Sequence, residues 1–545
     1  MVNLFPEIIA EGGKEPAYLQ RCPGLRRLVT LGSGPVRGLW AFNGSMYAVS
    51  GTTLYKLTSA YAVTALGTVS GEGPVSMADN GTQLFIAANP EGYIYNANTN
   101  VFGAITDPDF PGAVTVGYLD GYFVFNPPNS QRIYVTSLLD GTQVDPTEFG
   151  SAEGSPDGVV ALLSNFREIW VFGTNSVEVW YDSGATDFPL QRIQGAFNEL
   201  GCAAPYSVAK MDNGIFWLGK DARGQGIVYR ANGYTGQRIS THAVEWHIQS
   251  YGNINDAIAY TYQQDGHSFY VLTFPAADRT WVYDIATNAW HERAGWQDGQ
   301  FTRHRSNCQV FFNSDVVVGD YENGNLYAFD PTVYSDDGQI QKWLRSWRAL
   351  PTGQNNLKRT AHHMLQLDCE SGVGLAGADA ADFLGYLLTE ASEYIETQQS
   401  ATPGVVTPGP PWTVLSAAGT DYSIDDPVLS SAGTGYTVPT IVRDSIGVGF
   451  TIGTPLAGYY LELEGASVQG ANPQVMLRWS DDGGHTWSNE HWAPMGRIGQ
   501  YYARVIWRRL GMTLKLRDRV YEISGTDPVK IAIMGAELII DPTRA

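Results

Sequence analysis

One unit of short strands recurs seven times between residue 34 and about residue 330, and it restricts the fold more than any other feature. The first copy, Gly34–Leu57, contains an apolar stretch, a return after Asn43-Gly44 and a closing stretch with Tyr55. Asn-Gly favours a two-residue hairpin, because both central residues of a type I′ turn need positive φ. The closing tyrosines of the seven copies are Tyr55, Tyr95, Tyr134, Tyr181, Tyr229, Tyr283 and Tyr327.

The period of this repeat predicts a β-propeller. The closing tyrosines are 39 to 54 residues apart, and all-strand units of this length are typical of propeller blades. A single unit cannot bury both faces of its sheet, so neighbouring units must stack. A β-sandwich or a string of hairpins is the alternative. We predict an all-β fold: a propeller of about seven blade-like units, a second strand-rich C-terminal platform region and an inserted segment.

Changes of composition along the chain predict five regions. They are an N-terminal arm (1–33), the β-propeller (34–330), strands leaving the propeller for a platform (331–370), an inserted acidic domain that is a tip or a dock (371–458) and a C-terminal β platform region (459–545). The arm could pair with the last blade or reach a neighbouring subunit. The strands that flank the insertion, at 363–367 and 459–463, could pair with each other, and 378–398 could be one helix.

Charge is distributed unevenly over these regions. Residues 370–450 hold ten acidic side chains and one basic side chain, Arg443, whereas residues 471–545 hold ten basic and eight acidic ones. The net charge of the whole chain is −21, which argues against a general nucleic-acid-binding surface. It still permits a passage through which DNA slides without sticking.

The cysteines and the apolar runs restrict the cellular context. Cys22, Cys202, Cys308 and Cys369 are far apart and lack metal-ligand spacing, so we expect free, mostly buried thiols formed in a reducing compartment. The first residues contain no basic region and no long apolar run, so we expect no secretion signal. No apolar run approaches the roughly 18–20 residues of a membrane span.

The sharpest local motif is an Asp-box, Ser480-Asp481-Asp482-Gly483-Gly484-His485-Thr486-Trp487, which fits S-x-D-x-G-x-T-W. In such a turn the aspartate accepts backbone N–H bonds, a glycine takes the left-handed conformation and the tryptophan packs below. We predict a structural turn motif made of Ser480, Asp482, Gly484, Thr486 and Trp487. A sialidase would need several such boxes, an arginine cluster and a Tyr–Glu nucleophile pair, and this box occurs once, outside the blades.

Three arginines, Arg504, Arg508 and Arg509, form a basic cluster beside Trp507. Strand alternation puts Arg504, Ile506 and Arg508 on one face. We predict that the cluster makes ion pairs at a subunit or domain contact, because arginine is common at interfaces. A phosphate or carboxylate site is the alternative.

No pattern makes a positive case for an enzyme. His362-His363 has no carboxylate at metal-ligand spacing and no H-E-x-x-H exists, so we expect a structural pair. Ser207-Val208-Ala209-Lys210 matches S-x-x-K, which alone is a chance match in a strand. Carboxylates are too numerous for the sequence to nominate an acid/base couple. We therefore predict no catalytic residue, no cofactor and no metal.

Four runs of residues resemble one protein family. They are Tyr18–Gly24, Gly173–Trp180, Pro473–Ser488 and Ala503–Gly511. They are similar to the tail nozzle or hub proteins of short-tailed bacteriophages, also called packaged-DNA stabilisation proteins. The resemblance covers most of 1–370 and 459–545; the C-terminal run is fairly specific and the blade matches are generic.

The resemblance implies a structural role in a virion rather than catalysis. It implies a propeller subunit in a ring of six copies, below the portal and its adaptor, that continues the DNA channel, retains the packaged genome and conducts it during ejection. Expected partners are further copies of the chain, the adaptor and portal complex, tail fibres or tailspikes, a plug or needle protein, and double-stranded DNA in transit without specific binding. The expected location is the phage tail, assembled in the host cytoplasm. The alternative is a glycan-binding or glycosidase-like propeller, favoured by the Asp-box and by 15 Trp and 30 Tyr residues.

Overall fold

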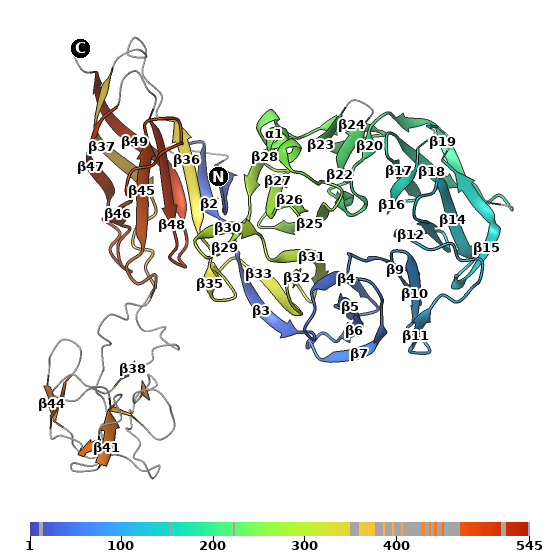
Figure 1. Cartoon of the computed structure of the whole chain (residues 1–545), viewed down its shortest axis with the longest axis horizontal. Coiled ribbons are helices and arrows are strands. Elements are labelled where there is room, and N and C mark those ends of the chain that lie inside the picture. Colours follow the sequence, from blue (N-terminus) through green and yellow to red (C-terminus); the bar gives the residue numbers. More distant parts are fainter. Residues whose placement is uncertain are drawn as a thin grey trace.

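The computed structural model describes residues 1–9, 15–152, 154–155, 157–186, 188–221, 224–348, 359–375, 469–513 and 519–542, together with short strands between 385 and 451. A propeller lies beside a two-sheet sandwich (Figure 1). The predicted all-β class, with about seven blade-like units and a strand-rich C-terminal region, is confirmed.

Seven sheets form the blades, and their strands are antiparallel apart from the pair of β3 with β34 in blade 7. Blade 1 contains β4 (Val36–Phe42), β5 (Ser45–Ser50), β6 (Thr53–Leu57) and β7 (Val63–Thr68), and blade 2 contains β8 (Ser76–Asp79), β9 (Gln83–Ala88), β10 (Glu91–Asn96) and β11 (Val101–Ala104). Blade 3 contains β12 (Thr115–Leu119), β13 (Tyr122–Asn126), β14 (Arg132–Ser137) and β15 (Asp140–Ser151). Blade 4 contains β16 (Val159–Asn165), β17 (Glu168–Gly173), β18 (Val177–Asp182) and β19 (Leu190–Asn198).

Blades 5 to 7 carry extra elements. Blade 5 contains β20 (Gly201–Cys202), η1 (Pro205–Ser207), β21 (Ala209–Met211), β22 (Gly214–Asp221), β23 (Gly224–Asn232) and β24 (Thr235–Arg238), and α1 (His242–Ser250) follows it. Blade 6 contains β25 (Ile258–Gln264), β26 (His267–Phe274), β27 (Arg279–Asp284) and β28 (Ala289–Glu292), and the hairpin of β29 (Ala294–Gln297) and β30 (Gln300–Arg303) follows it. Blade 7 contains β31 (Ser306–Phe312), β32 (Asp315–Asp320), β33 (Asn325–Asp330), β34 (Ser335–Asp336) and β35 (Gln339–Ile340).

The seven repeated tyrosines all lie on the third strand of a blade: β6, β10, β14, β18, β23, β27 and β33. The repeat therefore locates every blade. A fourth, outer strand that the sequence did not reveal follows the third strand in blades 1 to 6. These outer strands carry a weak pattern because they face solvent: in β7 and β11 most residues are exposed.

Turn chemistry explains several blade hairpins. Asn43 and Gly44 have φ values of 50° and 66°, as a type I′ turn requires. In blade 5 the Asn-Gly rule predicts the turn at Asn213-Gly214, and this is wrong by one residue. Positive φ occurs at Asp212 and Asn213, at 52° and 55°, and Gly214 already begins β22. Both Asp and Asn tolerate the left-handed conformation, so the glycine was not needed for the turn.

The N-terminal region closes the propeller. The strand β3 (Gly24–Thr30) pairs antiparallel with β33, with Leu25 opposite Phe329 and Arg27 opposite Tyr327. It therefore supplies the outer strand that blade 7 lacks, which is the first of the two roles expected for the arm. The inner strands of neighbouring blades contact one another around the ring.

Residues of blades 1, 3 and 5 lie close together around η1. Tyr206 of η1, in blade 5, donates its hydroxyl to the carbonyl oxygen of Val114 in blade 3, at 3.5 Å. Burial raises the pKa of Tyr206 to about 12, and the nearby Arg37 of blade 1 opposes this shift. Three separate blades thus approach one another here, which leaves no room between them for a duplex whose major groove alone is about 12 Å wide.

The sandwich joins segments that are distant in the sequence. One sheet has the order β1 (Leu4–Ile8), β2 (Ala17–Arg21), β49 (Ala532–Pro542), β37 (Thr360–Cys369) and β47 (Val505–Met512). The other has the order β36 (Trp343–Arg348), β48 (Val520–Gly525), β45 (Gln474–Ser480) and β46 (His491–Pro494). Their shared core includes Leu4, Trp343, Val475 and Tyr521.

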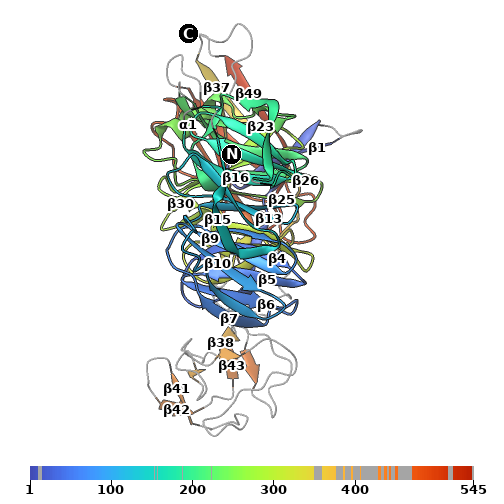
Figure 2. The same ribbon diagram turned by 90° about the vertical axis from the view of Figure 1, so that its right-hand side faces the viewer.

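The hairpin of β1 and β2 belongs to the sandwich but also reaches the propeller. Val2 forms β-bridges to both Leu344 and Glu292, so the first residues tie blade 6 to the sandwich. Figure 2 shows the far end of β1 projecting beyond the side of the molecule. The hairpin therefore both joins the two parts and extends away from them.

Short strands are described within the predicted insertion. They are β38 (Gly385–Tyr386), β39 (Ile395–Glu396), β40 (Val405–Val406), β41 (Pro427–Ser430), β42 (Gly435–Thr437), β43 (Ile441–Arg443) and β44 (Gly449–Thr451). The helix predicted over 378–398 is wrong where residues are described, because β38 and β39 lie there. β37, which contains the predicted flank 363–367, pairs with β47 and β49 on its two edges. The other flank, 459–463, lies outside the described residues.

Candidate functional site: the Asp-box turn, the arginine edge and the N-terminal junction

The Asp-box turn is held by its own side chains. Asp482 Oδ1 accepts the backbone N–H groups of His485 and Thr486, both at 2.9 Å, and Oδ2 accepts the Thr486 hydroxyl at 2.6 Å. Ser480 donates its hydroxyl to Asp482 at 2.6 Å and accepts the Gly484 N–H at 2.8 Å. Hydrogen bonds from Ser480 and Thr486 hold the pKa of Asp482 well below its usual range. Both carboxylate oxygens are thus engaged within the turn.

Glycine and tryptophan complete this turn. Gly483 and Gly484 have φ values of 79° and 102°, which L side chains rarely adopt. The guanidinium of Arg478 lies 4.7 Å from the centre of the Trp487 ring, and Arg478 also pairs with Glu522 at 2.5 Å. The geometry is that of a self-contained hairpin turn at the end of β45.

A buried ion pair anchors this turn to the rest of the sandwich. Arg519 is 2% exposed and donates to both carboxylate oxygens of Asp481, at 2.7 and 2.9 Å. It also donates to the carbonyl oxygens of Leu510 and Met512 at the end of β47, at 2.6 and 3.1 Å. Sequence reasoning missed this pair, because Asp481 occupies a variable position of the box and Arg519 is 38 residues away.

The three predicted arginines are exposed along one edge of the sandwich. β47 is the edge strand of its sheet, with Val505 and Trp507 buried and Arg504 and Arg508 exposed. Arg509 has φ 59° and is exposed as well, so a bulge interrupts the alternation after Arg508. None of these three guanidinium groups forms an ion pair or hydrogen bond with a residue in the described ranges. We call them the arginine edge.

A second cluster of charged groups lies where the N-terminal hairpin meets blade 6. His267 contacts Glu7 of β1 through Nε2 at 2.6 Å and Asp284 of β27 through Nδ1 at 2.8 Å. Burial alone would lower the pKa of His267, but the hydrogen bonds to both carboxylates outweigh it, and the pKa is raised. His267 therefore links the hairpin to the propeller through carboxylates on both sides of its ring.

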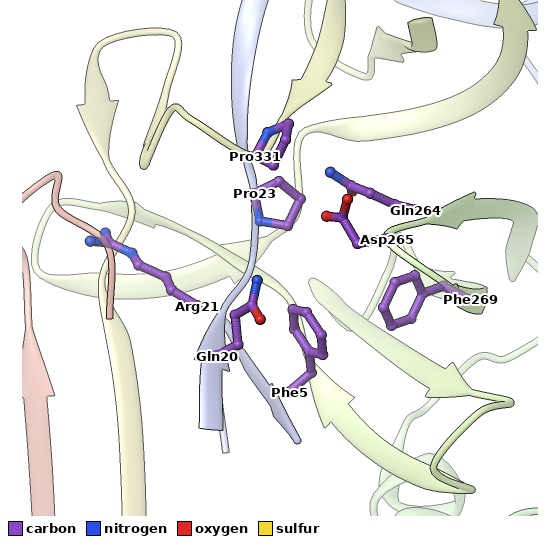
Figure 3. A pocket seen from close by; sticks show the side chains of 8 residues that line it. All are labelled: Phe5, Gln20, Arg21, Pro23, Gln264, Asp265, Phe269 and Pro331. Atoms are coloured by element: carbon purple, nitrogen blue, oxygen red, sulfur yellow. The ribbon is translucent and has the colours of Figure 1, made fainter. Parts of the chain in front are cut away.

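The junction around these three residues is closely packed. Figure 3 shows Phe5 and Gln20 of the hairpin opposite Asp265 and Phe269 of blade 6, with Pro23 and Pro331 above them and the Arg21 side chain pointing away to the left. The space that they enclose has a volume of about 10 Å³, roughly enough for one water molecule. Arg21 is 1% exposed and donates to Asp527 and Val529 carbonyl oxygens. This cavity is a packing gap rather than a ligand site.

The other residues singled out in the sequence do not converge on a site. His362 is buried between Tyr521 and Thr360, at 2.6 and 2.9 Å, and burial lowers its pKa to about 4. Its neighbour His363 lies on the surface, 3.1 Å from Asp541. Ser207 bonds the Ala204 carbonyl oxygen, whereas Lys210 bonds that of Ser164.

The thiols, possible metal ligands and helices of the described ranges add no catalytic centre. All four cysteines are free, Cys22 and Cys202 being buried and Cys308 and Cys369 half-buried. No group of three or more His, Cys, Asp or Glu side chains there could hold a metal ion. No helix of the described ranges is long and apolar enough to cross a membrane.

These observations define the class of protein. A propeller closed by an N-terminal strand and tied to a two-sheet sandwich is a propeller–sandwich scaffold. The chain belongs to the family described as bacteriophage P22 Gp10. The β-propeller of that family matches residues 1–334 and its β-sandwich matches residues 456–541.

One curated relative and two solved structures illustrate the similarity. The tail hub protein gp10 of Salmonella phage P22 is 23% identical over 295 residues, which is 50% of this chain and 59% of the relative. The Neurospora crassa Pan2 WD40 domain is 9% identical, with 56% of this chain and 96% of that chain covered and a TM-score of 0.38. The N-terminal domain of Nup159 is 10% identical, with 60% and 98% covered and a TM-score of 0.36. TM-scores below 0.5 are too low to carry a functional argument.

Proposed function

We propose that the chain is a structural subunit of a bacteriophage tail hub, or nozzle, and not an enzyme. The carrying observation is that both parts of the fold match the same phage family, one over residues 1–334 and one over 456–541. The curated relative is named a tail hub protein. The chain covers 59% of that relative, so the channel, the partners and the location are parts of this proposal.

DNA would pass between copies of the chain, not through one propeller. Tyr206 of blade 5 contacts Val114 of blade 3, which leaves no room for a duplex between these blades, so a channel for a duplex requires several copies arranged around a common axis. We propose six copies in a ring, below the portal and its adaptor, that retain the packaged genome and conduct it during ejection. The net charge of −21 suits this role, because carboxylates repel the phosphate backbone and leave no deep electrostatic trap.

The arginine edge would contribute to the contact between copies. Its three exposed guanidinium groups have no partner within the described residues, and most of the acidic excess lies elsewhere in the chain. Heterologous contacts repeated around an axis build a closed ring. The charges and the bulge at Arg509 also keep an open strand edge from pairing indiscriminately, which an isolated subunit needs before assembly.

Further tail proteins would bind the outside and the distal end of the ring. We propose tail fibres or tailspikes and a plug or needle protein as partners, with the region 371–458 as a tip or dock. The protein would then be a virion component, assembled in the host cytoplasm.

The location can be tested in particles. A stop codon in the gene should give particles that package DNA but leak it, and complementation should restore DNA retention. Affinity labels on a complementing copy should appear at the tail in electron micrographs. Labels on the capsid shell, or stable DNA-filled particles without the protein, would contradict the proposal.

A further inference from the structure

The arginine edge is part of a larger exposed surface at one end of the molecule. β47 pairs with β37 on one side only, so its other backbone edge is unpaired among the described strands. Tyr501 and Tyr502, which lie just before Arg504, are 75% and 83% exposed, and Met512 at the far end of β47 is 54% exposed. Tyrosine, methionine and arginine are enriched at protein–protein interfaces. The surface along β47 therefore has the composition of a docking surface.

The loop that presents the two tyrosines is held in place by hydrogen bonds. The Ser371 hydroxyl donates to the Tyr501 carbonyl oxygen at 2.9 Å, and the backbone N–H of Arg497 donates to the side chain of Gln500 at 3.0 Å. The N–H of Ala503 donates to the Gln500 carbonyl oxygen at 3.1 Å. Binding to a loop that is already ordered costs little conformational entropy, so these exposed rings are suited to contact a partner.

A surface of opposite charge lies at the other end of the molecule, on blades 2 and 3. Residues 72–148 hold nine acidic side chains and one basic side chain, Arg132, whose guanidinium lies 4.1 Å from the centre of the Phe149 ring. In Figure 1 the outer strands of these blades, β11 and β15, lie on the right, whereas β47 lies at the far left. The basic and the acidic surface therefore cannot meet within one copy.

Four carboxylates of blades 2 and 3 form a group that we call the acidic rim: Glu91, Asp107, Asp109 and Asp145. The loop after β11 brings them together. Its Ile105 N–H donates to the carbonyl oxygen of Gly92, next to Glu91, at 2.9 Å, and its Asp107 carboxylate accepts the N–H of Val144, next to Asp145, at 3.0 Å. None of the four carboxylates forms an ion pair with a residue in the described ranges. The rim is thus a set of negative charges that lack a cation.

The two surfaces complement each other in charge and in apolar contact. Hydrogen bonds from the Asp109 backbone and from the Thr147 hydroxyl hold the pKa values of Asp107 and Asp145 below their usual range, so both carboxylates are ionised at neutral pH, where arginine is always charged. Val101 on β11 is 64% exposed and gives this side an apolar side chain. A second copy of the chain therefore supplies what each surface lacks.

We propose that the arginine edge of one copy binds the acidic rim of the next copy, with the three guanidinium groups opposite the carboxylates and with Tyr501 and Tyr502 adding apolar contact. The contact joins two different surfaces, so it is heterologous, and its repetition around an axis closes a ring. This inference rests on the proposed ring and names the contact that closes it.

Charge reversal tests the contact in the full-length protein. The edge variant carries Arg504→Glu, Arg508→Glu and Arg509→Glu, and the rim variant carries Glu91→Lys, Asp109→Lys and Asp145→Lys. All six side chains are exposed, so the circular dichroism of both variants should match that of wild type. In mass photometry each variant alone should need at least a tenfold higher concentration to assemble, because like charges then face each other across the contact.

Mixing the two variants is the decisive arm of this experiment. In a ring of an even number of copies the variants can alternate, and every edge then meets a rim of opposite charge. An equimolar mixture should therefore recover most of the assembly that each variant has lost. Arg167→Glu with Glu199→Lys, which reverses charges at two exposed side chains outside both surfaces, is the matched control and should leave assembly unchanged.

A cross-link tests the geometry. Arg508→Lys keeps the positive charge and supplies an amine, so carbodiimide treatment of the assembled protein should join residue 508 to a carboxylate of the acidic rim. In a mixture of isotope-labelled and unlabelled protein, the cross-linked peptides should include pairs from different copies. Cross-links from residue 508 only to carboxylates outside the rim would contradict the proposed contact.

The outcomes separate this inference from the proposed ring. Rings that form normally in both reversal variants, or a mixture that assembles no better than either variant alone, would overturn this inference and leave the proposed ring intact. If wild type forms no ring even with portal and adaptor complexes present, the proposed ring fails as well. If both variants assemble normally but no longer bind a purified adaptor, fibre or plug protein, the two surfaces serve that partner and this inference is wrong.

Discussion

The ion pair between Arg519 and Asp481 should be one of the most sensitive points of the sandwich. Arg519 is 2% exposed, and Asp481 accepts two of its N–H groups at 2.7 and 2.9 Å. Asp481→Ala would leave the guanidinium buried with only the Leu510 and Met512 carbonyl oxygens. Removing one partner of a buried pair costs about 3–5 kcal/mol.

This loss should be local and can be measured by hydrogen exchange of the full-length chain. Amides of β47 and β48 should exchange at least ~100-fold faster in Asp481→Ala, since each ~1.4 kcal/mol is tenfold in an equilibrium. Amides of blades 2 and 3 should be unaffected. Asp541→Ala, which removes an exposed partner of His363, is the matched control and should change exchange little, because surface pairs contribute about 0–1 kcal/mol.

A paired replacement separates charge burial from loss of packing. Arg519→Met with Asp481→Leu removes both charges at once, and such swaps of buried pairs are often neutral. The double variant should therefore exchange more slowly than Asp481→Ala. If Asp481→Ala behaves like Asp541→Ala, the pair does not anchor the Asp-box turn and the reasoning is refuted.

Three further predictions concern the junction, the closure of the propeller and the ring. The pKa of His267 is raised in the folded chain, so the contribution of its protonated form to the free energy of unfolding is fully present below the ordinary pKa of about 6.5 and is lost as pH rises through the folded value. His267→Gln should therefore lower the melting temperature more at pH 6 than at pH 9, and equal losses at the two pH values would contradict this. A Cβ at Gly324 would collide with the Leu31 carbonyl oxygen, so Gly324→Ala should release β3 and expose residues 24–30 to protease, whereas Gly73→Ala, which meets nothing within 4 Å, should not. Reversal of Arg504, Arg508 and Arg509 to Glu should weaken ring assembly at least tenfold in mass photometry while circular dichroism stays unchanged; unaltered assembly would remove the arginine edge from the contact.

The sequence predicted the propeller because its signal is local and repeated. Each blade has a tight turn and a tyrosine on its third strand, and both depend on residues close in the chain. The outer strands were not predicted, because strands such as β7 and β11 are mostly exposed and show no alternation of apolar and polar residues. The turn of blade 5 was misplaced because Asp212 can adopt positive φ without a glycine.

The sandwich was harder to predict because its strands come from distant segments. One sheet combines β1 and β2 with β37, β47 and β49, and nothing local to these segments specifies such pairing. The Asp-box turn was predictable from its residue types, as was the alternation up to Arg508. The partner of Asp481 depends on contacts across the sandwich, which one sequence without a fold does not reveal.

The measurement that most directly tests the central claim is the mass of the purified protein in solution, together with electron microscopy of the same sample with and without portal and adaptor complexes. The account predicts closed rings with a central hole wide enough for a duplex, and end-on attachment of those rings to the adaptor. A chain that stays monomeric at every concentration, and that binds neither the portal nor the adaptor complex, would contradict the proposed ring.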